Sequence, residues 1–309
     1  MQRKGIFIVN KVPPFVLLVF ATILWGGNFV IGRGIASELP PFTLSFLRWC
    51  TAFLVFLPIA WLPLKREWRQ LKEYWRTVIF MAITGVASFN TLIYVALHHT
   101  TSINASLMNT STPIIIYILS FVFLKEKLTR NQLIGTLISL LGVLFIISKG
   151  SFESLLQFSF NQGDLIVIVA VICWAIYSLL VKQYAMRLPS SPTFLVSIFL
   201  GIIMLLPFYL YETMNPDIHI TWSMNSIGAI LYTGILASIA AFVCWNTGVI
   251  RLGANKAGIY LNFIPVFATL FAVLFIGESL QVFQMIGGLF VILGVFLTTR
   301  APRLRTSDG

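Results

Sequence analysis

The chain has 309 residues, of which 58% are hydrophobic and only 10% are charged. Soluble domains carry roughly 25% charged residues, so this composition excludes an ordinary water-exposed surface. The net charge of +11 would suit a nucleic-acid partner. The basic residues, however, lie in short segments between apolar runs and form no single basic face, so we predict no nucleic-acid binding.

Apolar runs of about 20 residues follow one another along the whole chain, each long enough to cross a bilayer as a helix. The links between them are too short to fold as a separate extramembrane domain. The first run follows a basic start, as in a signal peptide, but lacks a small-residue cleavage site, so we interpret it as an uncleaved first span. The predicted spans are 13–35, 42–62, 77–97, 102–123, 130–148, 164–184, 191–211, 225–246, 254–276 and 281–299.

The placement of Lys and Arg predicts the orientation in the membrane. With the amino terminus in the cytoplasm and sides alternating, 18 of the 21 basic residues fall on the cytoplasmic side. Arg33 and Lys149 fall outside, and Arg48 lies within a span. The sequence therefore predicts a multi-pass protein of the cell membrane with both termini in the cytoplasm.

The two halves of the sequence match each other in a slowly drifting register of 149 to 152 residues. The matched pairs are Trp25 with Trp174, Pro40 with Pro189, Pro58 with Pro207, Thr84-Gly85 with Thr233-Gly234, Tyr94 with Trp245, Pro113 with Pro265, and Glu126 with Glu278. Each half holds five predicted spans, an odd number, so the second half enters the membrane inverted. We predict an all-α integral membrane fold of ten transmembrane helices in two inverted five-helix repeats, 1–149 and 150–309, the second ending in a short basic cytoplasmic tail. Inverted repeats are typical of secondary transporters, whose site lies near the midplane between the halves.

Short motifs in both halves resemble those of one known family. They are Trp25-Gly26-Gly27-Asn28-Phe29-Val30, then Phe123-Leu124-Lys125-Glu126-Lys127-Leu128-Thr129 with Phe275-Ile276-Gly277-Glu278-Ser279-Leu280, and Gln132-Leu133-Ile134-Gly135 with Gln284-Met285-Ile286-Gly287. Together, over about residues 15–299, they resemble the EamA family of the drug/metabolite transporter superfamily. The resemblance implies a ten-span exporter or permease for amino acids or other metabolites, with spans 1, 3, 4, 6, 8 and 9 along the pathway.

Polar side chains inside spans are costly and are therefore functional candidates. Asn28, Asn90, Asn109, Asn246 and Asn262 all fall within spans. Aromatic walls with a few polar groups suit a small-molecule cavity. We predict that solute is bound by Trp25, Asn28, Asn90, Tyr94, Asn109, Trp174, Tyr177, Trp245 and Asn262. The alternative is that small and polar stripes serve close helix packing and that the aromatic residues pack or face lipid.

Two prolines and one arginine have separate interpretations. Pro113 and Pro265 are predicted to break their helices and free the carbonyls four residues earlier, at Asn109 and Leu261. A freed carbonyl can bind solute or water, or a neighbouring hydroxyl such as that of Thr112. Arg48 is interpreted first as snorkelling outward or pairing structurally, and second as a charge selector that attracts carboxylates in the cavity.

The sequence gives no set of residues for catalysis, a metal or a cofactor, so we predict a transporter and not an enzyme. Its partners are then a small-molecule solute and membrane lipid. The absence of Asp and Glu from the middle of the spans favours facilitated diffusion or exchange over proton coupling through a buried acid. A passive channel and, less favoured, an intramembrane enzyme are the alternatives. The small face of Gly135, Ser139 and Gly142 indicates close helix packing, within the chain or in a homodimer.

Overall fold

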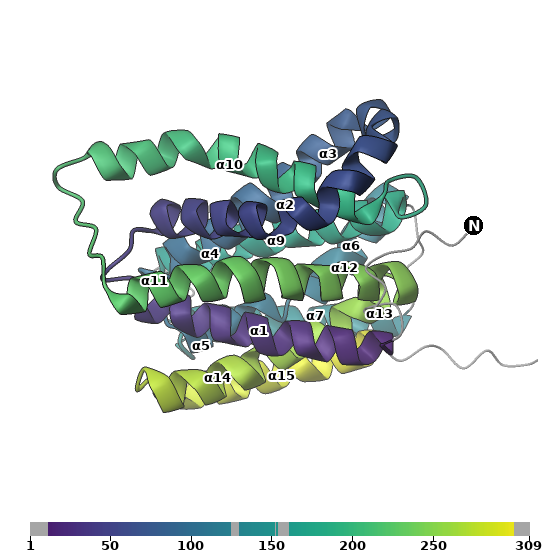
Figure 1. The fold of residues 1–309 in the computed structure, drawn as a ribbon. Helices are drawn as coiled ribbons and strands as arrows, with labels where there is room; N and C mark the ends of the chain where they lie inside the picture. The colour runs from purple at the N-terminus through teal and green to yellow at the C-terminus, as the bar shows by residue number, and fades with distance from the viewer. Residues whose placement is uncertain (1–11, 125–129, 152, 154–160, 300–309) are drawn as a thin grey trace, which may run out of the picture.

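The computed structural model describes residues 12–124, 130–151, 153 and 161–299, and these form a bundle of helices (Figure 1). The helical elements are α1 (Pro14–Gly34), α2 (Pro41–Glu73), α3 (Trp75–Met81), η2 (Ala82–Ser88), α4 (Phe89–Leu97), α5 (Ser102–Asn109), α6 (Thr112–Leu124), α7 (Arg130–Ile147), α9 (Gln162–Tyr184), α10 (Ser190–Met214), α11 (Met224–Leu231), η3 (Tyr232–Ala240), α12 (Ala241–Leu252), α13 (Ala254–Gly258), η4 (Ile259–Asn262), α14 (Phe263–Phe275) and α15 (Val282–Thr299). The described residues contain no strand.

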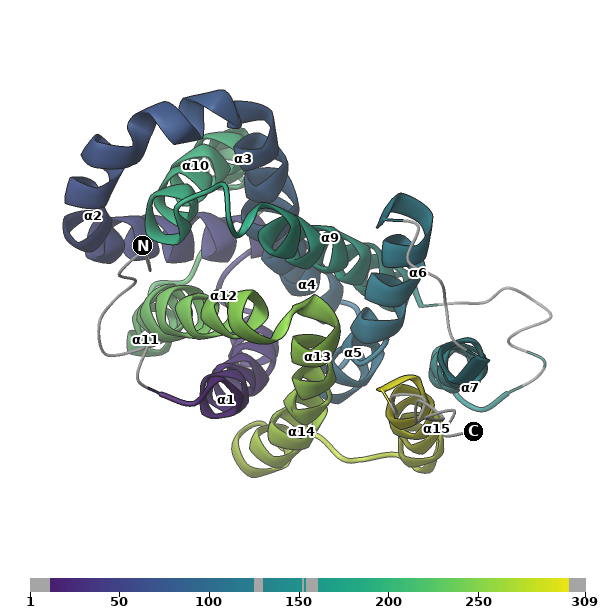
Figure 2. The same cartoon turned by 90° about the vertical axis from the view of Figure 1, so that its right-hand side faces the viewer.

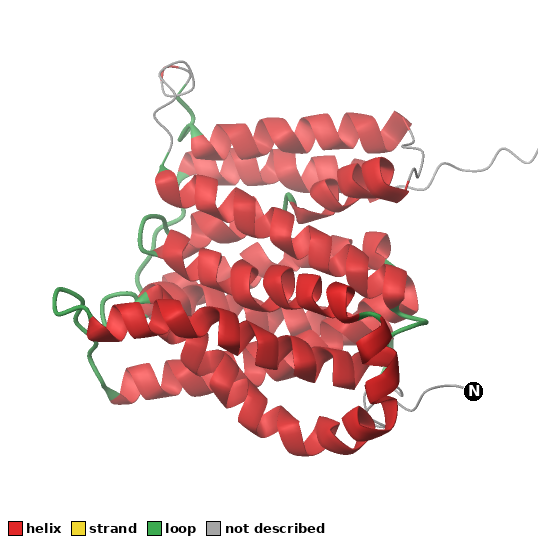
Figure 3. Ribbon diagram, turned by 90° about the horizontal axis from the view of Figure 1, so that it is seen from above, coloured by secondary structure: helices red, strands yellow, loops and turns green. Residues whose placement is uncertain are grey.

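The helices run side by side, and loops join them at the ends of the bundle (Figure 3). Seven stretches are helical, long and apolar enough to span a membrane: Pro14–Gly34, Pro41–Glu73, Trp75–Leu97, Ser102–Phe123, Gln162–Tyr184, Ser190–Met214 and Met224–Leu252. Three shorter apolar helices are Leu133–Ile146, Tyr260–Phe275 and Val282–Gly294. Helices thus cover every predicted apolar range, while the count of ten membrane spans stays a prediction. Residues 1–11, 125–129 and 300–309, which include both termini, Glu126 and much of the predicted cytoplasmic charge, lie outside the described residues.

Two acidic side chains hold the starts of helices that lie far away in sequence. The carboxylate of Glu212, at the end of α10, accepts hydrogen bonds from the backbone N–H groups of Phe42 (3.1 Å) and Thr43 (2.6 Å) at the start of α2. That of Glu278 accepts from the N–H groups of Ser102 (2.9 Å) and Ile103 (3.1 Å) at the start of α5. The first N–H groups of a helix lack intrahelical partners and attract negative charge. These contacts therefore tie the second half of the chain to the first.

Two of the long helices contain a π-helical segment, with one extra residue per turn. η2 lies between α3 and α4, and η3 lies between α11 and α12. Thr84 and Thr233 occupy corresponding places in them, and each hydroxyl donates to the carbonyl four residues earlier at 2.7 Å. The sequence pattern did not predict these segments, although it matched the two Thr-Gly pairs that they contain. π-Helical turns inside α-helices are frequent at functional sites.

Helices α7 and α15 form a closely packed pair at one side of the bundle (Figure 2). Their backbones approach at glycines, because a Cβ atom added at Gly294 would lie 2.4 Å from the carbonyl oxygen of Gly135, and one at Gly287 would lie 2.9 Å from that of Gly142. The predicted small face of span 5 thus packs within the chain. A homodimer stays a prediction.

Replacing Gly294 with leucine is expected to separate α7 from α15 and to lower the melting temperature in detergent. The added side chain meets backbone atoms, which cannot rotate away, and overpacking typically costs about 1–3 kcal/mol. The matched control is Leu293→Phe, which adds bulk one residue earlier at a side chain that is exposed on the outside of the bundle. Thermal unfolding monitored by tryptophan fluorescence measures both. Equal melting temperatures for the two variants would contradict the close packing at Gly294.

Candidate functional site

A cluster of buried aromatic rings fills the middle of the bundle. The ring of Trp25 lies 5.2 Å from that of Trp174 and 5.5 Å from that of Trp245, measured between centroids. Phe242 packs against both Trp25 and Trp174. The indole N–H of Trp25 donates to the carbonyl oxygen of Ala237 at 3.0 Å, so the π-helical segment η3 holds the orientation of this ring. The repeat-matched tryptophans therefore meet across the two halves of the chain.

Next to these rings is a small chamber of about 10 Å³ lined by buried side chains, which is room for about one water molecule. Its wall combines aromatic rings, aliphatic side chains and three amides from α1, α4, α5, α9, η4 and α14. The lining residues are Trp25, Asn28, Phe29, Phe89, Asn90, Ile93, Asn109, Trp174, Leu261 and Ile264. The side-chain N–H₂ of Asn90 is buried and has no hydrogen-bond partner. An unpaired buried donor is costly, so this group is a candidate to donate a hydrogen bond to a ligand.

Arg48 lies at the back of this chamber and is fully buried, with 0% exposure. Its guanidinium donates to the hydroxyl of Ser238 through Nε (2.8 Å) and Nη2 (2.6 Å). Nη1 donates to the side-chain oxygens of Asn28 (3.2 Å) and Asn90 (2.9 Å) and to the hydroxyl of Tyr94. The interpretation that Arg48 snorkels to the surface is therefore wrong, because four neutral partners satisfy the guanidinium inside the protein. The structural pairing expected as its alternative is what the structure contains.

The Tyr94 hydroxyl also donates to the side-chain oxygen of Asn28, at 2.7 Å. This places Tyr94 in the Arg48 network beside the chamber and not in the chamber wall. The arginine and its partners come from α2, α1, α4 and η3, and they connect the two halves of the chain at mid-bundle. Because all the partners are neutral, the positive charge of Arg48 is not cancelled by any of them.

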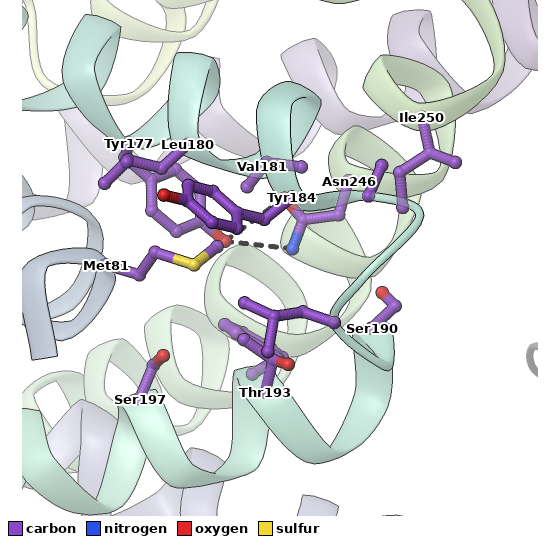
Figure 4. Close-up of a pocket in the computed structure, with 13 residues that line it drawn as sticks. Met81, Tyr177, Leu180, Val181, Tyr184, Ser190, Thr193, Ser197, Asn246 and Ile250 are labelled. Carbon is purple, nitrogen blue, oxygen red and sulfur yellow. Dashed lines mark hydrogen bonds between the residues drawn. The ribbon is translucent and has the colours of Figure 1, made fainter. Parts of the chain in front are cut away.

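A second cavity, of about 30 Å³, lies between α9, α10 and α12 (Figure 4). Tyr177 and Asn246 face each other there, and the amide N–H₂ of Asn246 donates to the Tyr177 hydroxyl at 2.9 Å. The hydroxyls of Thr193 and Ser197, which also line this cavity, are buried without a hydrogen-bond partner. Trp174 and Tyr177 lie one helical turn apart on α9, so the Tyr177–Asn246 pair stands between the chamber and this second cavity.

The two prolines each follow an interruption in a helix. α5 ends at Asn109 and α6 begins at Thr112, with Pro113 in its first turn, where a missing N–H costs nothing. The carbonyl oxygen of Asn109 accepts from the Thr112 hydroxyl at 2.6 Å, so a neighbouring hydroxyl, and not a ligand, satisfies it in this structure. In the second half, the 3-10 turn η4 precedes α14, and Pro265 lies in the first turn of that helix.

The structure brings together only part of the predicted solute-binding set. Trp25, Asn28, Asn90, Asn109 and Trp174 line the chamber, and Tyr177 lines the second cavity. Trp245 packs on the tryptophan cluster without reaching either cavity. The side chain of Asn262 does not line the chamber, where span 9 contributes Leu261 and Ile264 instead.

Sequence reasoning missed Ser238 and the role of Asn246. Asn246 carried a signal, as one of five asparagines within spans. A serine in a helix carries none, because its hydroxyl usually bonds to a carbonyl of its own helix. Ser238 lies in the π-helical segment η3, and its hydroxyl accepts from Arg48.

Outside the spans we considered one titratable histidine and possible metal ligands. Partial burial, followed by the charges of His99 and Arg33, lowers the pKa of His98 below its usual value. Among the described residues, no group of three His, Cys, Asp or Glu side chains could hold a metal ion.

Apolar helices of spanning length, closed around a small polar and aromatic chamber, define a multi-pass membrane protein with an internal site. The model of the EamA-like transporter family matches residues 13–148 and 161–300, and the chain belongs to this family. It is similar to the uncharacterized transporter YyaM of Bacillus subtilis, with 28% identity covering 95% of this chain and 97% of that protein. An uncharacterized transporter of Archaeoglobus fulgidus is 31% identical, covering 92% of this chain and 96% of the relative. The protein is thus a membrane transporter.

The fold is also similar to that of a chain of known crystal structure. The two align with a TM-score of 0.67 over 93% of this chain and 97% of the other. They share only 19% of their residues, so the likeness concerns the fold alone.

Proposed function

We propose that this protein is a secondary transporter that moves amino acids or related small amphiphilic metabolites by alternating access, with ten spans in two inverted repeats. The observation that carries the proposal is the buried chamber, which three asparagines and two tryptophans line at mid-bundle. A chamber of about 10 Å³ is too small for an amino acid. Transport would then require the chamber to widen and to open to one side of the membrane at a time.

The chemistry of the wall supports the proposed solute class. Amides offer both donors and acceptors, and so can bind the carboxylate and the ammonium group of one small molecule. Tryptophan rings cover apolar parts of a solute and attract a cationic group to their faces. The uncancelled charge of Arg48 behind Asn28 and Asn90 favours a solute with a carboxylate.

The proposal is tested by trans-stimulated uptake into proteoliposomes preloaded with a mixed pool of amino acids and other small metabolites. We expect uptake to rise when a transported solute is present inside the liposomes. The binding site of a carrier turns back to the outside faster with solute bound than without, whereas a channel has no such step. The Asn109→Ala variant should lose about tenfold in uptake, since a hydrogen bond to a charged group contributes about 1.5–3 kcal/mol. Asn131→Ala is the matched control, because Asn131 is exposed on α7 and away from the chamber.

Uptake without trans-stimulation would indicate a passive channel. Stimulation only by solutes outside the amino-acid class would leave the carrier in place and overturn the proposed solute class. Equal uptake by the Asn109 and Asn131 variants would contradict the chamber as the binding site.

A further inference from the structure

A third cavity, separate from the chamber, lies between α1, the α11–η3 segment and α14. Its volume is about 560 Å³, far larger than that of the other two cavities. Both η3 and α14 pack against α1, and α1 lies between α11 and α14 when the bundle is viewed from its end (Figure 2). The cavity is therefore a groove with α1 as its floor and the other two segments as its walls.

Small residues create the space in this groove. Gly27 and Gly34 lie on its floor, and Gly228 lies in one wall. A Cβ atom at Gly228 would meet no protein atom within 4 Å, so a side chain there would extend into open space. At the deep end the groove is closed, because a Cβ atom at Gly27 would lie 2.3 Å from the Tyr232 hydroxyl, which donates to the carbonyl of Leu24.

The groove follows α1 from mid-bundle to the end of this helix. From Gly27 to Gly34 the floor advances seven residues, or about 10 Å at the helical rise, and residues 35–38 continue it in turns. Half of a bilayer core is about 15 Å thick, so the groove takes up a large part of one leaflet. Gly27 lies at mid-bundle beside Trp25 and Asn28 of the chamber, whereas Glu38 follows the end of α1. The groove thus runs from the middle of the membrane to one surface.

The groove is apolar along its length and acidic at its surface end. Val30 and Ile35 lie on its floor, Phe271 and Phe275 lie in one wall, and Glu38 lies at the open end. The Glu38 carboxylate accepts a hydrogen bond from the Ser223 hydroxyl. Among the described residues, no basic side chain forms an ion pair with it. An anion without a counter-ion at the membrane surface attracts a cationic group that can also donate hydrogen bonds.

We propose that this groove binds an acyl chain of a membrane lipid whose head group carries a primary amine, with the ammonium group at Glu38. The apolar lining of the groove fits the acyl chain, and the carboxylate fits the head group. The residues of α1 that face the groove, such as Val30, differ from those that face the chamber, such as Asn28 and Phe29. The lipid site is therefore distinct from the proposed solute site, and it requires only that the protein spans a membrane.

The test uses the purified full-length protein in detergent with added phosphatidylethanolamine or phosphatidylglycerol of identical acyl chains. Native mass spectrometry counts the lipids retained, and thermal unfolding measures their effect. We expect about threefold more retained phosphatidylethanolamine than phosphatidylglycerol, as one partly exposed ion pair allows. Phosphatidylethanolamine should also give the larger rise in melting temperature.

Two variants test the contributions of the lipid head group and of the acyl chain to binding one at a time. Glu38→Gln should abolish the preference between the two lipids, and Gly228→Leu should remove the retained lipid by filling the groove. Leu54→Phe is the control, because Leu54 is exposed on α2, away from the groove. Equal retention of the two lipids by the wild type would overturn the proposal, and so would a Gly228→Leu variant that is folded and retains as much phosphatidylethanolamine as the Leu54→Phe control.

Discussion

Replacing Arg48 with glutamine is expected to reduce both the stability and the transport of this protein. Glutamine is too short to bind Ser238 on η3 and the two asparagines at the same time, so several buried polar atoms lose their partner. Each unsatisfied buried group costs about 1–3 kcal/mol, so the loss should be at least about 3 kcal/mol. Thermal unfolding in detergent and uptake into proteoliposomes measure the two effects.

Lysine and a surface arginine supply the controls for this experiment. Arg48→Lys keeps the charge but offers one compact ammonium group in place of the planar guanidinium with its several N–H donors. We therefore expect its stability and transport to lie between those of Arg48→Gln and the wild type. Arg69→Gln removes an exposed arginine and should leave both measurements unchanged. If Arg48→Gln melts and transports like Arg69→Gln, the buried network does not hold the two halves together.

The same variants test Arg48 as a charge selector. If its charge attracts carboxylates, Arg48→Gln should lose more uptake of acidic and zwitterionic solutes than of neutral ones, while Arg48→Lys should keep the preference. If its role is only to position Asn28 and Asn90, uptake of all solutes should fall by the same factor. The comparison between solutes separates the two roles even where both variants are less stable.

The helices were largely predictable from the sequence because the bilayer demands long apolar runs of any helix that crosses it. Predicted ranges such as 164–184 and 191–211 differ by only a few residues from α9 and α10. Trp25 and Trp174, which the sequence matched to each other, lie 5.2 Å apart between ring centroids, while the inverted-repeat arrangement stays a prediction. Five of the ten chamber residues were in the predicted set, because asparagine and tryptophan inside a span carry a signal and the apolar lining residues do not.

The surroundings of Arg48 could not be predicted, because they depend on where a side chain points. An arginine about two turns from a helix end can reach the surface or the interior, and hydropathy does not distinguish the two directions. The Arg48 side chain points to the interior, because hydrogen-bond acceptors from three other segments converge on it there. They belong to Ser238, Asn28, Asn90 and Tyr94. The π-helical segment that contains Ser238 also has no compositional signal, since η3 contains mostly ordinary apolar and small residues.

Replacing Gly234 with alanine is expected to disturb the contact between η3 and α2. A Cβ atom at Gly234 would lie 2.7 Å from the Cβ atom of Thr51 and 2.9 Å from the carbonyl oxygen of Arg48. Neither atom can move without shifting the α2 backbone, and overpacking of this kind typically costs about 1–3 kcal/mol. Because the shift would carry Ser238 away from Arg48, uptake into proteoliposomes should fall together with the melting temperature.

Gly228→Ala is the matched control, since it makes the same change six residues earlier in the same continuous helix. Its Cβ atom would meet nothing within 4 Å, and alanine favours a helix over glycine by up to about 1 kcal/mol. The control should therefore melt at the same or a slightly higher temperature and keep its transport. A Gly234→Ala variant that behaves like this control would mean that α2 and η3 slide apart easily. The close approach at Gly234 would then not fix the position of the Arg48 network.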